Sequence, residues 1–213
     1  MKVIIYSHTH WDREWYLSQI QFQFRLVRTL DEILELLQTE DVPAAFVCDG
    51  QTSMINDYLE MRPERRDEVA ALAAEGRLVI GPWFTMPDVF LPDGESLIRN
   101  LLRGYRDCLA LGARYPNTGY VPDSFGHIEQ MPQLMRGVGI DNYFFSRGRP
   151  EAIRTAKGYK REFIWQAPDG SEVYAWPLPG SYCSAGYLPS PRDGNALKAT
   201  VQRIFDAHKP SYV

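Results

Sequence analysis

The stretch GYVPDSFGH, residues 119–127, has the pattern of a strand that ends beside a reactive side chain. Residues 119–121 form a short apolar run, and the following X-Pro step favours extended backbone up to Asp123. A glycine and a segment of helical spacing come next, which predicts a strand, a turn and a helix. Ligands of parallel α/β folds gather at the carboxyl ends of strands, so chemistry is expected at Asp123.

The same unit recurs on both sides of this stretch. Strand-like apolar runs occupy residues 3–6, 44–48, 78–81, 118–121 and 143–145. Helical spacing of apolar residues is found between and after them, at residues 26–37, 62–76, 94–111, 130–138 and 195–208. This alternation predicts an α/β fold of five parallel βα units.

The C-terminal third departs from this alternation. Residues 162–166 and 172–176 flank a Pro-Asp-Gly-Ser turn, which predicts a peripheral, antiparallel β-hairpin. Residues 178–191 are rich in Pro, Gly and Ser and predict a long loop. Residues 211–213 resemble the beginning of a further strand, so we expect the domain to continue beyond Val213.

Composition excludes several classes of protein. The 213 residues are 45% hydrophobic and 23% charged, as in globular domains, and the net charge of −4 without a basic stripe disfavours nucleic-acid and anionic-membrane partners. The three cysteines form no CxxC pair, which disfavours a disulfide framework or a thiolate zinc site. With no membrane-length apolar run and no signal-peptide pattern, a cytoplasmic location is expected.

The first strand is followed by a candidate metal site. In extended backbone alternate side chains share a face, so His8, His10 and Asp12 can point together. Imidazole and carboxylate ligands suit Zn²⁺ or a similar divalent ion, which in a catalytic site needs about three protein ligands and an open position. A single histidine at such a place is more often structural, but three candidate ligands within five positions favour a metal.

The other strand ends also carry polar or aromatic groups. Asp49 and Thr52 follow the second strand, where either could also cap the next helix. Trp83 and Asp88 follow the third, and Trp83 is as well explained by the core as by a binding site. Arg147 follows the fifth, where a guanidinium is a natural partner for a carboxylate.

Asp123 itself has more than one interpretation. A carboxylate at this place can bind a metal, attack an electrophilic carbon, do both, or simply cap a helix. His127, four residues further on, is better explained as structural. Aromatic side chains that could stack on a sugar gather near these strand ends, and about half of them are expected to be core: Trp11, Trp15, Tyr16, Trp83, Phe84 and Phe125.

Five motifs together resemble one known family. They are HTHWDREWY at residues 8–16, CDGQT at 48–52, GPWFTMPD at 81–88, GYVPDSFGH at 119–127 and FFSRG at 144–148. In type, order and spacing they resemble the N-terminal catalytic domain of family 38 glycoside hydrolases, the α-mannosidases, over essentially residues 1–213. The form HWDREWY is most similar to the bacterial branch that contains mannosylglycerate hydrolases. The resemblance implies a seven-stranded α/β barrel, incomplete in this chain, and an α-mannoside substrate.

The resemblance also assigns roles to single residues. It implies that His10 and Asp12 bind zinc and that Asp123 is both a third ligand and the glycosidic nucleophile. Trp15 would stack under the sugar and Arg147 would pair near Asp123. Asp12, Trp83 and Asp88 are further expected to contact the substrate. The family pattern gives His8 no metal role, and we follow the family on this point.

Such an enzyme would be a retaining glycosidase, which needs a second carboxyl group as acid and base. By the family pattern this group and the fourth zinc ligand are expected beyond Val213. The isolated chain is therefore expected to be inactive, and its open sheet edge favours self-association. The alternatives are a metal-dependent carbohydrate deacetylase, although the HxxxH spacing is missing, and a non-catalytic sugar-binding fragment.

Overall fold

The computed structural model describes residues 6–39, 45–148, 162–178, 181–183, 186 and 194–207. The chain forms two compact units. Unit 1 comprises Met1–Pro87 and Asp93–Asn117, and unit 2 comprises Asp88–Pro92 and Thr118–Val213. The strand predicted at residues 3–6 lies almost wholly outside the described residues, as do the strand at 211–213 and most of the loop at 178–191.

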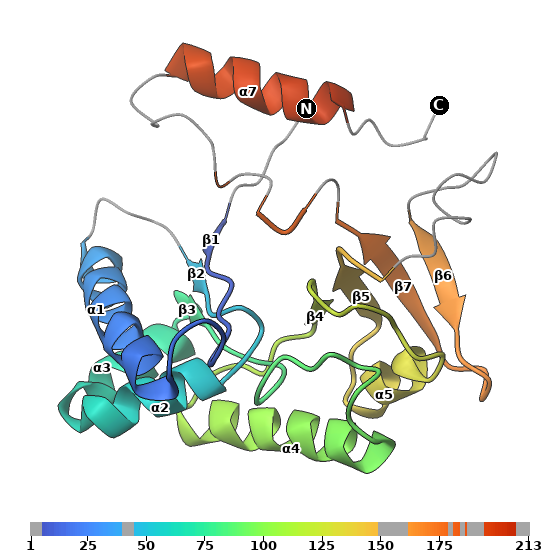
Figure 1. Ribbon diagram of the computed structural model, residues 1–213, viewed down its shortest axis with the longest axis horizontal. Helices are drawn as coiled ribbons and strands as arrows, with labels where there is room; N and C mark the ends of the chain where they lie inside the picture. Colours follow the sequence, from blue (N-terminus) through green and yellow to red (C-terminus); the bar gives the residue numbers. More distant parts are fainter. Residues whose placement is uncertain are drawn as a thin grey trace. The chain divides into compact units, whose positions relative to one another are not determined.

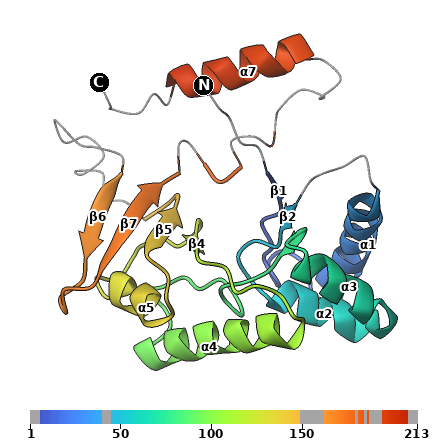
Figure 2. The same ribbon diagram turned by 180° about the vertical axis from the view of Figure 1, so that it is seen from behind.

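Unit 1 contains a parallel three-stranded sheet in the order β1-β2-β3. These strands are β1 (Ser7–His8), β2 (Phe46–Val47) and β3 (Leu78–Val79), and Ser7 lies opposite Phe46. The helices of the unit are α1 (Gln19–Gln38), α2 (Ser53–Met61), α3 (Arg66–Ala74), which follows the 3₁₀ turn Pro63–Arg65, and α4 (Gly94–Ala110). Figure 2 shows α1, α2 and α3 beside this sheet.

Helix α1 is held by one apolar stripe. Its fully buried side chains recur every three or four residues and are Phe22, Leu26, Leu30, Leu34 and Leu37. Because this spacing matches the helical repeat, they share one face, and the four leucines pack into the core formed with β2, β3 and α2. The predicted helix over residues 26–37 is confirmed and begins about two turns earlier, where the Ser18 N–H donates to Gln21 Oε1 at 3.1 Å.

Helix α4 begins at a capping aspartate and passes unusually close to the main chain after β3. The Asp93 carboxylate accepts a hydrogen bond from the Ser96 N–H at 2.7 Å. Two turns later stands Gly104, at which a Cβ atom would lie 2.1 Å from the Pro82 carbonyl oxygen. Only glycine permits this approach, which fixes α4 against the loop that follows β3.

Unit 2 contains a mixed sheet in the order β4-β5-β7-β6 (Figure 1). These strands are β4 (Gly119–Val121), β5 (Asn142–Phe145), β6 (Phe163–Gln166) and β7 (Glu172–Pro177). Strand β5 pairs in parallel with both β4 and β7, and β6 pairs with β7 in antiparallel orientation. Helix α5 (Met131–Gly137) packs on β5 and β7, and α7 (Gly194–Ala207) is the last helix described.

The parallel α/β architecture is confirmed, with two corrections. The hairpin is antiparallel as predicted but is not wholly peripheral, because β7 pairs with β5 and alternates exposed and buried residues. Of the two hairpin strands, β6 alone is at an edge of the sheet. Helix α2 was not predicted, because it buries polar Ser53 and Asp57 beside its apolar residues. The described strands form two hydrogen-bonded sheets, so the seven-stranded barrel stays a prediction.

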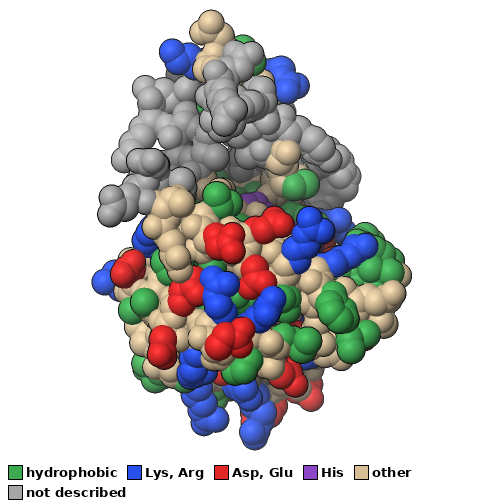
Figure 3. Space-filling view, turned by 90° about the vertical axis from the view of Figure 1, so that its left-hand side faces the viewer, with side chains coloured by type: hydrophobic (Ala, Val, Ile, Leu, Met, Phe, Trp, Pro, Cys, Tyr) green, Lys and Arg blue, Asp and Glu red, His purple; other side chains and the backbone are tan. Residues whose placement is uncertain are grey.

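The surface agrees with the charge pattern of the sequence. On the face shown in Figure 3, acidic and basic side chains alternate without a basic stripe. Among the described residues, no helix has the length and apolar character needed to span a membrane.

We expect Gly104→Ala to destabilise the protein, because the new methyl group would collide with main-chain atoms of Pro82 and Trp83. The expected loss in free energy of unfolding is about 1–3 kcal/mol. The matched control is Gly94→Ala in the same helix, where a Cβ meets nothing within 4 Å and the change should stay within about 0.5 kcal/mol. Equal urea midpoints for the two variants would contradict the close approach.

Candidate active site

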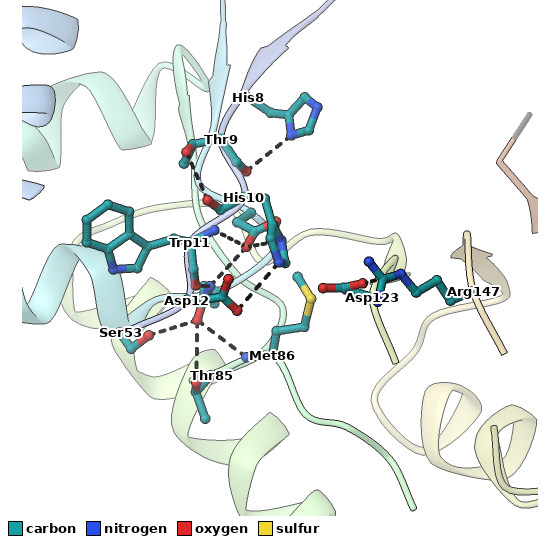
Figure 4. Close-up of polar contacts among 12 residues, drawn as sticks. His8, Thr9, His10, Trp11, Asp12, Ser53, Thr85, Met86, Asp123 and Arg147 are labelled. Carbon is teal, nitrogen blue, oxygen red and sulfur yellow. Dashed lines mark hydrogen bonds and ion pairs between the residues drawn. The ribbon is translucent and has the colours of Figure 1, made fainter. Parts of the chain in front are cut away.

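The loop after β1 brings His10 and Asp12 together with Asp49, which follows β2 (Figure 4). The Nδ1 atom of His10 lies 3.1 Å from Asp49 Oδ2, and its Nε2 atom lies 3.6 Å from Asp12 Oδ1. The parallel pairing of β1 with β2 places these two strand ends side by side. Of the three predicted candidates, His8 is oriented differently, with its Nδ1 atom 3.1 Å from the Thr9 carbonyl oxygen.

Asp49 is the buried centre of this group. Its side chain has no exposed surface, and a buried carboxylate is costly unless donors surround it. Besides His10, the Trp11 main-chain N–H donates to Oδ2 at 2.8 Å and the Gln51 Nε2 donates at 3.1 Å. The backbone of Asp49 has a φ of +49°, which is uncommon for a residue other than glycine and turns the side chain back toward the β1 loop.

Gln51 connects this group to the loop after β3. Its Nε2 atom donates to the Trp11 carbonyl oxygen at 2.9 Å as well as to Asp49. Its Oε1 atom accepts a hydrogen bond from the Ser53 hydroxyl at 3.0 Å and lies 3.4 Å from both the Thr85 hydroxyl and the Met86 N–H (Figure 4). The loops that follow β1, β2 and β3 are therefore joined by one buried amide.

The remainder of the β1 loop is fixed by a second ion pair and leaves an aromatic ring exposed. Arg13 forms a two-pronged ion pair with Asp57 of α2, with N–O distances of 2.7 and 2.9 Å. Trp15 is 74% exposed and meets the ring of Tyr16 edge-on, with centroids 5.1 Å apart. The Tyr16 hydroxyl accepts a hydrogen bond from Arg25 of α1 at 2.7 Å. Trp15 thus presents a free face on a loop that is tied to α1 and α2.

In unit 2, Asp123 follows β4 and is paired with Arg147, which follows β5. The Arg147 Nε atom lies 2.7 Å from Asp123 Oδ1 in an ion pair, and the guanidinium also lies over the Phe125 ring. Tyr182 hydrogen-bonds to the same carboxylate. Burial and the negative charge of Asp123 raise the pKa of Tyr182, so the phenol stays protonated and acts as the donor.

Asp88 hydrogen-bonds to the loop that carries Asp123 and so supports it. Its Oδ1 atom lies 3.0 Å from the hydroxyl of the buried Ser124 and 3.3 Å from the Phe125 N–H. The Val89 N–H donates to the same hydroxyl, and the Phe90 ring covers Gly126, where a Cβ atom would be 1.7 Å from the ring. Residues 88–92 are therefore packed against the residues that follow Asp123.

Trp83 is the substrate-binding prediction that the structure does not favour. Its side chain has no exposed surface, and its main chain pairs with Gly50 and Thr52. Of the two interpretations that the sequence allowed, the structure favours the core residue, because a ring without exposed surface offers no face to a substrate.

Comparison with known proteins identifies the family. A model of the glycosyl hydrolases family 38 N-terminal domain matches residues 1–210. The chain belongs to this family.

Individual relatives of the family 38 chain agree. A protein from Halalkalibacterium halodurans named "Putative mannosylglycerate hydrolase" is 39% identical over 212 residues, which are 96% of this chain and 24% of that protein. The Saccharomyces cerevisiae alpha-mannosidase is 26% identical over 181 residues, 84% of this chain and 16% of that one. A crystal structure of an alpha-mannosidase from Enterococcus faecalis matches with a TM-score of 0.84 and 31% identity, over 95% of this chain and 22% of the other.

The chain therefore spans about a quarter or less of the length of these relatives.

Within the part of the family 38 chain that the structure describes, no three His, Cys, Asp or Glu side chains form a group that could hold a metal ion. The structure does bring His10 and Asp12 together, and it brings Arg147 to Asp123, as the sequence predicted. A metal site that also includes Asp123 stays a prediction.

Sequence reasoning missed the contacts of Asp49 and Tyr182. Asp49 was recognised as a residue at a strand end, but its bond to His10 depends on a left-handed main-chain conformation that no sequence pattern announces. Tyr182 lies in a stretch that the sequence marks only as a loop.

We expect Asp49→Asn to destabilise the family 38 chain. The amide replaces one carboxylate oxygen by an NH₂ group, which is a donor and would face groups that already donate to Asp49. The expected loss is about 1–3 kcal/mol in free energy of unfolding. Asparagine tolerates positive φ, so the main chain is not the cause. The control is Asp12→Asn, whose side chain is 43% exposed and should change stability little. Equal stability of the two variants in urea would argue against the buried network.

Proposed function

We propose that the protein is a zinc-dependent, retaining glycoside hydrolase that cleaves α-mannosides, either as an α-mannosidase or as a mannosylglycerate hydrolase. The observation that carries the proposal is the Asp123 carboxylate, held by Arg147 at a strand end in a chain that matches family 38 over residues 1–210. The names of the relatives support the substrate class, since they are α-mannosidases and a mannosylglycerate hydrolase.

His10 and Asp12 fit the first two ligand positions of a zinc ion. Asp49 accepts a hydrogen bond from Nδ1 of His10, which leaves the Nε2 lone pair pointing to Asp12. Two ligands on a tetrahedral ion with bonds of about 2.0–2.1 Å lie roughly 3.3 Å apart, close to the observed 3.6 Å. We take Asp123 as a third ligand on the family resemblance alone. Zinc bound there would supply a positive charge that holds sugar hydroxyls.

The chemistry that we assign to the chain's own residues begins at Asp123. Its carboxylate would attack the anomeric carbon, the bond to the leaving oxygen would break, and an acidic group elsewhere in the protein would protonate that oxygen. Water would then release mannose from Asp123. The ion pair with Arg147 and the contact with Tyr182 hold the carboxylate in one orientation, which favours attack along a fixed line.

Substrate contacts are proposed for Trp15, Asp12 and Asp88. Trp15 has an exposed aromatic face of the kind on which sugars stack. Asp12 is partly exposed and would face both the ion and a hydroxyl group. Asp88 also holds the loop of Asp123, so its loss should affect both binding and the geometry of the nucleophile.

The metal assignment can be tested by comparing His10→Ala with His8→Ala. The two residues lie two positions apart, but only His10 is bonded to Asp49 and close to Asp12. Removing a ligand should lower zinc affinity by at least about 100-fold, beyond the 10–100-fold typical of partners that only orient a ligand. Titration calorimetry with zinc measures the affinity. His8→Ala should bind zinc like the parent, and equal losses in both variants would contradict the assignment.

The nucleophile can be tested in the longest natural form of the protein. Asp123→Asn should keep the fold and lose nearly all cleavage of aryl α-mannosides, because an amide is not a nucleophile. The matched control is Asp169→Asn in the exposed turn between β6 and β7, which should retain activity.

A fluorinated mannosyl fluoride offers a second measurement on the parent protein. It should label Asp123, since the trapped sugar stays on the nucleophile. The labelled peptide is identified by mass spectrometry. A label on another carboxylate, or acetate release from an acetylated sugar in place of mannoside cleavage, would refute the proposed reaction.

A further inference from the structure

His127 joins the two loops that carry Asp123 and Arg147, although the sequence suggested only a structural role. It lies between β4 and α5, four residues after Asp123. Its Nε2 atom is 2.9 Å from the main-chain carbonyl oxygen of Arg147, and its Nδ1 atom is 3.0 Å from the hydroxyl of Tyr143. The ring also meets the aromatic rings of Phe145 and Trp165 edge-on, which limits its rotation.

The two partners define which nitrogen of His127 carries the proton. A carbonyl oxygen can only accept, so Nε2 must donate to Arg147. Burial lowers the pKa of His127, so the ring is neutral near pH 7 and Nδ1 accepts a hydrogen bond from Tyr143. Burial also raises the pKa of Tyr143, which keeps that hydroxyl protonated. His10 is the opposite case, because its Nδ1 donates to the Asp49 carboxylate.

The main chain of Arg147 is held on both sides. Its N–H donates to the Pro122 carbonyl oxygen at 3.1 Å, and its own carbonyl accepts from His127 at 2.9 Å. The next residue, Gly148, has a φ of +80°, and a Cβ atom there would lie 2.8 Å from the His127 ring. Glycine thus allows both the turn and the approach of the ring. With its main chain fixed, the Arg147 side chain has fewer ways to leave Asp123.

We propose that His127 is a positioning residue, which holds the main chain of Arg147 through its Nε2–H and so keeps the Arg147 guanidinium on the Asp123 carboxylate. The hydrogen bond and the ion pair lie within unit 2. The effect on catalysis rests on the proposed function, in which Asp123 is the nucleophile. The effect on the ion pair is independent of the proposed function.

The first measurement uses the unmodified chain. Long-range ¹H–¹⁵N NMR spectra of the histidine rings should show His127 with its proton on Nε2 and His10 with its proton on Nδ1. The His127 signal is assigned by its loss in His127→Gln. A proton on Nδ1 of His127 would overturn the proposal, whatever the variants do.

The second measurement follows the ion pair through hydrogen exchange of the Arg147 Nε–H, which is assigned by its loss in Arg147→Lys. In His127→Asn the amide replaces Nδ1 and cannot reach the Arg147 carbonyl, so exchange should become at least about tenfold faster. In His127→Gln the amide nitrogen replaces Nε2, and exchange should return to within about threefold of the parent. Thermal unfolding separates a local change from a loss of the fold.

The third measurement separates this inference from the proposed function. In the longest natural form of the protein, His127→Asn should lower kcat on an aryl α-mannoside at least about tenfold with KM changed less than about twofold, and His127→Gln should recover kcat. Unchanged Arg147 exchange in a folded His127→Asn overturns the inference. Faster exchange in a protein whose parent form cleaves no mannoside supports the inference and overturns the proposed function instead.

Discussion

The buried carboxylate of Asp49 is the constraint that fixes the loops after β1 and β2. A negative charge with no exposed surface is stable only when donors meet it, and here they come from the His10 ring, the Trp11 main chain and the Gln51 amide. These donors belong to the loops after β1 and β2, so all of them reach the carboxylate only when both loops have their native conformation. The direction of the His10 ring follows from this requirement, and Nε2 of the ring lies 3.6 Å from the partly exposed Asp12 carboxylate.

The second unit is organised around a buried neutral side chain, the Ser124 hydroxyl. Asp123 is partly exposed, while the side chain next to it, Ser124, is buried and shares its hydroxyl with Asp88, Val89 and Gly126. In both units the group suited to chemistry reaches solvent, and a buried neighbour fixes the loop that carries it. The buried neighbours explain why the reactive side chains, on loops that follow very short strands, still have defined directions.

Sequence reasoning succeeded where topology alone decides the answer. The strand ends of each parallel sheet share one edge. His10 and Asp12 in unit 1, and Asp123 and Arg147 in unit 2, could therefore be selected by their places after apolar runs. It failed where the result depends on local conformation or on burial. Trp83 could not be separated from a surface tryptophan, and α2 was missed because two of its buried residues are polar. The place of β7 inside the sheet was missed because a hairpin pattern does not reveal which other strand it pairs with.

The route of the chain through the two units has a practical consequence for dissecting the protein. Residues 88–92 belong to unit 2, while the residues on either side of them belong to unit 1. A cut after residue 117 therefore does not separate the units. The piece that begins at residue 118 would lack Asp88, Val89 and Phe90, leaving the Ser124 hydroxyl without two of its partners and Gly126 uncovered. A faithful isolated version of unit 2 would require a rearranged gene, in which a linker joins residues 88–92 ahead of residue 118.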